Sequence, residues 1–160
     1  PTVFSPVTFN SLDKKITLTV VDGGFFMSNP SLQALIEAME LYPDKREFLL
    51  VSLGTGLYVP KFNIEEVKTW GIWSWLGDMI IITTTSNAQD THDTLKHFLA
   101  MNEQNKVYII HYYRINILLP KEQSNPFNVD PDNIQQLHQL GKELVKDQQP
   151  ALDEIVKILQ

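Results

Sequence analysis

Leu18-Thr19-Val20-Val21-Asp22-Gly23-Gly24-Phe25-Phe26-Met27-Ser28-Asn29-Pro30 is the stretch on which the prediction of the fold depends. Residues 16–21 are rich in β-branched side chains and predict a strand, and the two adjacent valines favour one that is buried on both faces. The strand ends at Asp22, where two glycines permit a tight loop and a close backbone approach. Ser28 or Asn29 can then cap a helix, and the proline suits its first turn.

The residues that follow continue the alternation of strand and helix. Apolar side chains recur at helical spacing at Leu32, Leu35, Ile36 and Met39. Residues 48–53 form an apolar run that ends at Gly54-Thr55-Gly56, which predicts a second buried strand and a glycine-rich loop. Strand, helix and strand in succession predict a right-handed crossover and a parallel sheet. Sites in such sheets gather at the carboxyl ends of the strands, so we expect Asp22 and the glycine loop at one edge.

The flanking segments predict more helices and one more strand. Residues 1–15 and 119–129 are expected to be irregular, and 64–68 carry a short helical signal. Residues 107–118 alternate as a strand, and two amphipathic helices follow, one capped by Asp130 and one opened by Pro150. Residues 74–104 are ambiguous, because the β-branched run 80–85 favours a strand whereas the later apolar spacing favours one long helix.

Composition excludes several classes of function. The 160 residues fit one domain, and the net charge of -6 argues against a nucleic-acid partner and weakens attraction to anionic lipid. The absence of cysteine excludes disulfides, thiolate zinc sites and thiol nucleophiles, but it does not fix the compartment. The longest apolar stretch, 71–82, is shorter than the roughly 20 residues that a transmembrane helix needs.

Asp22 is the one candidate catalytic residue, and two interpretations of it stay open on local sequence alone. Asp-Gly is a common turn pair, so the aspartate can be a turn residue. A carboxylate at the end of a buried strand can also act as a general base. The four histidines show no metal-ligand spacing, and His111 is expected to be structural rather than a triad base. Neither a cofactor nor a metal is predicted.

Three tryptophans cluster in sequence, at Trp70, Trp73 and Trp75. They can form an aromatic patch that faces a membrane, or they can pack a helix into the core, which base rates for clustered aromatic residues favour. A peripheral membrane contact therefore stays open.

Several motifs, taken together and in order, resemble the patatin-like phospholipases. They are Pro1-Thr2-Val3-Phe4-Ser5-Pro6, Val21-Asp22-Gly23-Gly24, Asn29-Pro30 with Ala34 and Glu37-Ala38, Val51-Ser52-Leu53-Gly54-Thr55-Gly56, Val107-Tyr108-Ile109 to Arg114-Ile115, and Asp130 with Leu140-Gly141. The resemblance covers nearly the whole chain, and the Asp-Gly-Gly and Ser-Leu-Gly-Thr-Gly blocks are specific as a pair. Ser28 departs from the family, which commonly has Asn there, and we expect the serine to be tolerated as a cap.

The resemblance implies a three-layer α/β/α fold of the FabD/lysophospholipase-like type, with a mainly parallel sheet, and it favours helix over residues 74–104. It also implies a Ser–Asp dyad in a lipid acyl hydrolase (a phospholipase A or esterase). Asp22 would be the dyad aspartate and would take the serine proton directly. The substrate would be a phospholipid or another acyl ester.

This chain contains neither the Gly-x-Ser-x-Gly elbow nor the oxyanion loop of that family. Residues 1–160 are therefore expected to be the C-terminal portion of a single hydrolase domain, whose N-terminal portion is the missing partner, and to be inactive alone. The alternative is a non-catalytic binding or scaffold module that retains a hydrolase-like half, for which a covered sheet edge is expected. A cytoplasmic or peripheral membrane location is expected, and secretion stays open.

Overall fold

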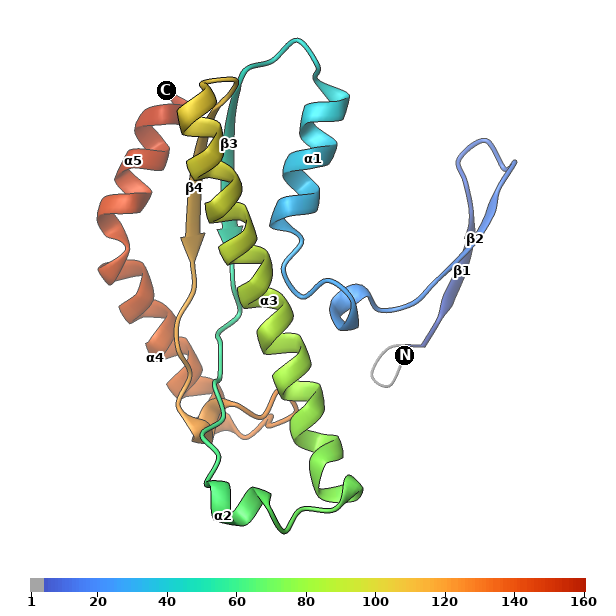
Figure 1. Ribbon diagram of the computed structural model, residues 1–160, viewed down its shortest axis with the longest axis vertical. Helices are drawn as coiled ribbons and strands as arrows, with labels where there is room; N and C mark the ends of the chain where they lie inside the picture. The colour runs from blue at the N-terminus through green and yellow to red at the C-terminus, as the bar shows by residue number, and fades with distance from the viewer. Residues whose placement is uncertain (1–4) are drawn as a thin grey trace.

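The computed structural model describes residues 5–160 (Figure 1). Most of the segment Pro1–Pro6 that contributed to the family resemblance therefore lies outside the described residues. The elements are β1 (Val7–Asn10), β2 (Thr17–Val20), the 3-10 turn η1 (Gly23–Phe25), α1 (Ser31–Leu41), β3 (Glu47–Leu53), α2 (Ile64–Val67), α3 (Ile72–Asn105), β4 (Ile109–Ile115), the 3-10 turn η2 (Lys121–Gln123), α4 (Pro131–Asp147) and α5 (Gln149–Leu159).

A parallel pair of strands, β3 and β4, forms the centre of the molecule. The register runs from Glu47 opposite Ile109 to Leu53 opposite Ile115, which confirms the two strands predicted there. Successive side chains of a strand point to opposite faces. Tyr112 accordingly meets His92 of α3, whereas Tyr113 bonds Glu154 of α5 on the other face. The protein is thus an α/β structure with helices against both faces of its parallel pair, and its fully apolar core comprises Leu35, Leu95, Ile115 and Ile155.

The strand before Asp22 does not belong to this sheet, contrary to the prediction of a doubly buried parallel strand. β2 pairs antiparallel with β1 in a separate hairpin, and every residue of both strands is exposed. The hairpin extends away from the helices and the parallel pair (Figure 1). Its register places Val7 opposite Val20 on one face and Thr8 opposite Thr19 on the other, where the two hydroxyls lie 3.0 Å apart. The β-branched residues therefore form an alternating antiparallel ribbon, and residues 7–10 are a strand rather than irregular chain.

The ambiguous segment forms one helix. α3 has 34 residues, which corresponds to about 50 Å at 1.5 Å per residue. The threonines of the β-branched run are accommodated within it, as Thr84 shows by donating its hydroxyl hydrogen to the carbonyl of Ile80 at 2.9 Å. The helix ends at Lys106, whose φ of 51° is left-handed. Among the described residues, no helix combines the length and the apolar character that a bilayer span requires.

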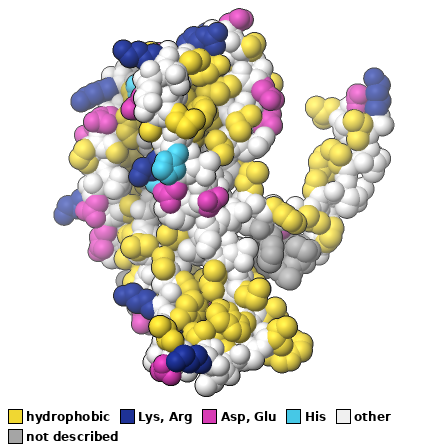
Figure 2. All heavy atoms as spheres, viewed as in Figure 1, with side chains coloured by type: hydrophobic (Ala, Val, Ile, Leu, Met, Phe, Trp, Pro, Cys, Tyr) yellow, Lys and Arg dark blue, Asp and Glu magenta, His cyan; other side chains and the backbone are white. Residues whose placement is uncertain are grey.

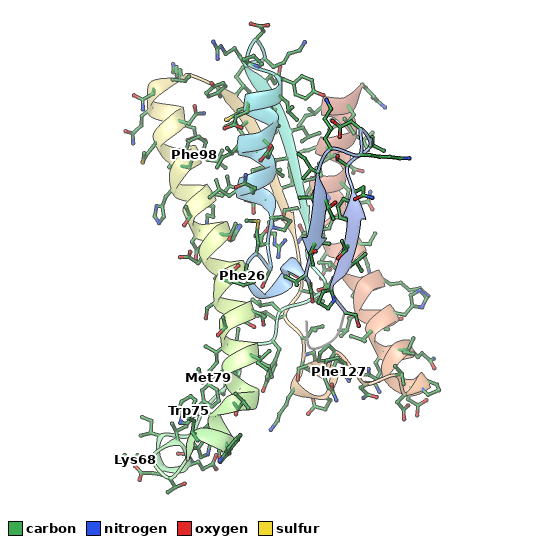
Figure 3. The ribbon with its side chains drawn as sticks, turned by 90° about the vertical axis from the view of Figure 1, so that its right-hand side faces the viewer. Phe26, Lys68, Trp75, Met79, Phe98 and Phe127 are labelled. Carbon is green, nitrogen blue, oxygen red and sulfur yellow. The ribbon has the colours of Figure 1, made fainter. Side chains whose placement is uncertain are left out.

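The beginning of α3 carries the aromatic cluster (Figure 3). Phe62, Trp70 and Trp75 pack together, with ring centroids 5.1 to 6.2 Å apart. Trp73 does not join them and is 85% exposed, beside Ile72 at 77%. Figure 2 shows apolar side chains gathered at this end of the molecule. Two of the three tryptophans thus take part in packing, as the core interpretation expects, and the third does not.

Candidate active site at the Asp22 loop

Asp22 begins a short turn that its own side chain stabilises. It is the N-cap of η1, and its Oδ1 accepts a hydrogen bond from the backbone N–H of Gly24 at 3.0 Å. The side chain is half-buried. Among residues 5–160, no other hydrogen bond or ion pair reaches the carboxylate, so its second oxygen is available to a partner.

The end of this loop enters α1 through Asn29 rather than Ser28. Asn29 Oδ1 accepts from the N–H of Ser31 at 3.2 Å, and its Nδ2 donates to the carbonyl of Ala88 at 3.2 Å. Ser28 instead donates its hydroxyl hydrogen to the carbonyl of Gly24 at 2.8 Å. Of the two capping candidates, Asn29 is therefore the one that bonds the helix, and Ser28 closes the loop on itself.

A buried polar cluster ties this helix start to the parallel strands. Asn29, Ser31 and Ser52 are 1%, 5% and 6% exposed. Ser31 Oγ hydrogen-bonds to both Asn29 Oδ1 and Ser52 Oγ, and Arg114 Nη1 donates to Ser52 Oγ at 2.7 Å. Because buried polar groups are stable only when they are paired, this cluster fixes the start of α1 against β3 and β4. The alternating pattern of residues 107–118 predicted that Arg114 lies in a strand. Nothing in the sequence indicated that Arg114 meets the other three residues of this cluster.

A cavity of about 390 Å³ lies beside the cluster, at the carboxyl ends of β3 and β4. Its lining includes the helix start 28–31, the loop Gly54-Thr55-Gly56, Arg114 and Asn116. Gly56 has a φ of 104°, and its N–H donates to Asn116 Oδ1 at 3.0 Å. A Cβ on Gly54 would lie 2.3 Å from the Asn116 side chain. The glycines are therefore needed for a close approach, and Asn116, which the sequence did not single out, is the residue that approaches.

The structure brings Gly54-Thr55-Gly56 to the end of the Asp22 loop, at Ser28, rather than to Asp22 itself. Asp22 is absent from the lining of the cavity, and no bond among the described residues joins it to the glycine loop. The expectation of one shared sheet edge is corrected in this respect, because β2 belongs to the hairpin. Residues 28–31 link the Asp22 loop to the cavity at the carboxyl ends of the parallel strands.

Two of the histidines, His92 and His111, make side-chain contacts away from Asp22. His92 Nδ1 and the Tyr112 hydroxyl lie 2.8 Å apart. Burial lowers the pKa of His92, with Lys96 acting in the same direction, and burial raises the pKa of Tyr112, so both are neutral at pH 7. His111 pairs with Glu47 at 3.1 Å across the two strands, on the face opposite Tyr112. The described part of the chain contains no group of three or more His, Cys, Asp or Glu residues placed to hold a metal.

The parallel strands have helices on both faces and a cavity at their carboxyl ends. This arrangement defines the chain as an α/β protein, a class in which sites lie at that edge of the sheet. No family model matches the chain. It is 35% identical to Patatin-like protein 6 of Arabidopsis thaliana over 103 residues, and 33% identical to Patatin-like protein 8 over 99 residues. Patatin-like protein 2 is 37% identical over 71 residues. The chain is therefore related to the patatin-like proteins.

The matches cover 58%, 56% and 36% of this chain in the same order. They cover 20%, 18% and 17% of the relatives. The chain thus spans about a fifth of the length of the curated relatives it matches.

Proposed function

We propose that this chain supplies the aspartate of a Ser–Asp dyad in a lipid acyl hydrolase of the phospholipase A or esterase type. The observation that carries the proposal is the Asp22 carboxylate, held at the crest of a glycine-rich loop with one oxygen available. In the reaction, a serine hydroxyl attacks the ester carbonyl while Asp22 accepts its proton, and the leaving alkoxide takes that proton from Asp22 and departs as the alcohol. Water then attacks the acyl-serine while Asp22 accepts a proton from it, and the fatty acid leaves as the serine oxygen takes that proton back. Backbone N–H groups stabilise each oxyanion.

The serine of the dyad comes from another part of the protein, since no Gly-x-Ser-x-Gly occurs here. β3 pairs with β4 along one edge, and no strand among residues 5–160 pairs with its other edge. Val51 and Leu53 of that strand are 39% and 72% exposed. These two side chains lie on one face of the sheet, and the other edge of β3 is unpaired among the described residues. A two-stranded parallel sheet of this kind is unusual, since parallel sheets are normally larger and covered. The complete domain would add strands at this edge and form a three-layer α/β/α fold, of which this chain is the C-terminal portion.

The same edge gives an argument for one of the two hypotheses. A self-contained scaffold module is expected to cover the edges of its sheet, whereas half of a hydrolase domain is expected to leave one open. The open edge of β3 therefore supports the hydrolase. In this proposal the chain alone has no turnover, and its first partner is the remainder of its own domain.

The test replaces Asp22 by Asn in the full-length parent protein and measures hydrolysis of a p-nitrophenyl ester and of phospholipid vesicles. Turnover is expected to fall by about 10²- to 10⁴-fold, because Asn cannot accept the proton. The fold is expected to survive, because Asn is as good an N-cap as Asp.

Asp130→Asn is a matched control, because Asp130 Oδ1 caps α4 through the N–H of Asp132 at 2.9 Å in the same local geometry. This variant should keep full turnover. Undiminished hydrolysis by Asp22→Asn would refute the dyad assignment.

A further inference from the structure

Asn87, in the middle of α3, bonds the backbone of the Asp22 loop twice. Its Nδ2 donates to the carbonyl of Phe26 at 2.9 Å, and its Oδ1 accepts from the N–H of Ser28 at 3.2 Å. A side-chain amide offers both a donor and an acceptor, and here both engage main-chain groups two residues apart. The Asn87 side chain thus bonds one carbonyl and one N–H of the loop, as the backbone of a neighbouring strand would. Figure 3 shows Phe26 beside α3.

A short series of hydrogen bonds connects this amide to the carboxylate. Ser28, whose N–H bonds Asn87, donates its hydroxyl hydrogen to the carbonyl of Gly24 at 2.8 Å. Gly24 in turn donates its N–H to Asp22 Oδ1 at 3.0 Å. Met27 closes the same turn by donating its N–H to the Gly23 carbonyl at 2.8 Å. A shift of Ser28 therefore moves the group that orients the Asp22 carboxylate.

The loop depends on α3 because its other side is weakly supported. β2, which leads into Asp22, is exposed along its whole length and lies in the separate hairpin. The next residue of α3, Ala88, accepts the side-chain bond of Asn29. Leu95, two turns further along α3, is fully buried and anchors the helix in the core. The position of the Asp22 loop relative to the parallel strands is thus set by α3 and by the helix start at Asn29.

We propose that Asn87 is a positioning residue for Asp22, holding the carboxylate where it can take a proton from the nucleophile. This inference rests on the proposed function. Asn87 is not among the residues that line the cavity, and in this proposal it acts by fixing the backbone between Phe26 and Ser28. The orientation of a catalytic group is worth a large part of the rate, and a displacement of about 1 Å can cost about 10²-fold.

A matched control lies on the same helix. Asn102 makes a similar pair of bonds near the C-terminal end of α3, where its Nδ2 donates to the carbonyl of Tyr108 at 2.7 Å and its Oδ1 accepts from the N–H of Tyr108 at 3.1 Å. The two asparagines are 15 positions apart in sequence, about 22 Å along the helix. Replacing either removes an amide clamp on the main chain, but only one of the clamps holds the Asp22 loop.

The experiment compares Asn87→Ala, Asn87→Asp and Asn102→Ala in the full-length parent protein, by steady-state hydrolysis of a p-nitrophenyl ester. Asn87→Ala should lower kcat by about 10- to 100-fold and leave KM within a factor of about two. Asn87→Asp should lower kcat in the same sense, because a carboxylate keeps the bond from Ser28 but cannot donate to the Phe26 carbonyl. Asn102→Ala should keep the kcat of the wild type per folded molecule.

Amide hydrogen exchange of Ser28 supplies a readout that does not depend on turnover. Its protection should fall in Asn87→Ala and persist in Asn102→Ala. Loss of protection with an unchanged kcat would overturn the positioning role while leaving the dyad proposal intact. An equal fall of kcat in Asn87→Ala and Asn102→Ala would also overturn it, since general destabilisation would then explain both. Full activity of Asp22→Asn would remove the dyad proposal and this inference together.

Discussion

The hydrogen bond between Arg114 and Ser52 is predicted to contribute measurably to stability, because it ends in a buried hydroxyl. Ser52 is 6% exposed and accepts from Arg114 Nη1 at 2.7 Å. A hydrogen bond to a charged group contributes about 1.5–3 kcal/mol, and the half-buried guanidinium places this one toward the lower end. Ser31 loses one of its partners when Ser52 becomes Ala but keeps Asn29. We therefore expect Ser52→Ala to cost about 2 kcal/mol.

A double-mutant cycle measures the pair. Ser52→Ala, Arg114→Met and the double variant are unfolded in urea and followed by circular dichroism and tryptophan fluorescence. Methionine keeps the aliphatic stem of Arg114, so the cycle reports chiefly the polar contact. The coupling energy should be about 1–2 kcal/mol, and Ser52→Ala should lower Tm by about 4–8 °C in a chain of this size. Ser74→Ala, at an exposed position of α3, should stay within about 0.5 kcal/mol of the wild type.

Additive single effects in that cycle, within about 0.5 kcal/mol, would refute the reasoning. Additivity would mean that water can replace the hydroxyl of Ser52 as the partner of Arg114 without a loss of stability. The buried cluster would then not be what holds the start of α1 against the strands.

Two further predictions follow from the same structure, one on glycines and one on pH. Gly56→Ala should cost about 1–3 kcal/mol in thermal denaturation, because its φ is 104° and the new Cβ would lie 2.5 Å from Leu119, whereas Gly141→Ala, in a helix with open space, should stabilise by up to about 1 kcal/mol. Burial lowers the pKa of His92 in the folded state, so the unfolded state binds more protons below about pH 6.5 and stability should fall from pH 7 to pH 5. In urea titrations, His92→Gln should reduce the dependence of the unfolding free energy on pH. An unchanged dependence would contradict its attribution to His92.

The sequence predicted the two strands of the parallel pair and the helices around them, because these elements carry strong local signals, but it predicted residues 16–21 as the parallel partner of 48–53, whereas the partner is β4. The stretch 48–53 is apolar and stops at glycines, and residues 109–115 alternate between two faces that the structure confirms. Asp130 caps α4 as predicted. Such hydrophobic patterns are enough to predict an element when that element buries one face against a neighbour.

The sequence does not predict the hairpin, because the adjacent Val20 and Val21 favour a strand buried on both faces and residues 1–15 are expected to be irregular. Its alternation was nevertheless present, with Val7, Phe9, Leu18 and Val20 on one face and threonines and Asn10 on the other. The segment between the strands is longer than the two-residue turns that mark hairpins most clearly. The alternation of the strand before Asp22 thus favours an antiparallel ribbon, whereas its position before the aspartate and the glycines predicts a strand of the parallel sheet.

The contacts around the candidate site could not be predicted, since they join residues far apart in sequence. Asn87 and Asn116 show no periodicity or motif that marks them, and Ser52 lies in the Ser-Leu-Gly-Thr-Gly block without any sign of its partners. Each acts through an amide or hydroxyl whose partner is decided by the packing of whole elements. By contrast, Asp22 was selected by local sequence and family resemblance, and its role stays a prediction that the dyad experiment tests.

The two amide clamps on α3 constrain how this protein can vary in length during evolution. An α-helix turns by about 100° per residue, so one inserted or deleted residue between Asn87 and Asn102 would rotate one clamp away from its target while the other stayed in place. Homologous sequences should therefore keep this interval constant while the loop around η2 gains and loses residues. The number of residues between Asn87 and Asn102 thus fixes the distance along α3 between the Asp22 loop and the start of β4.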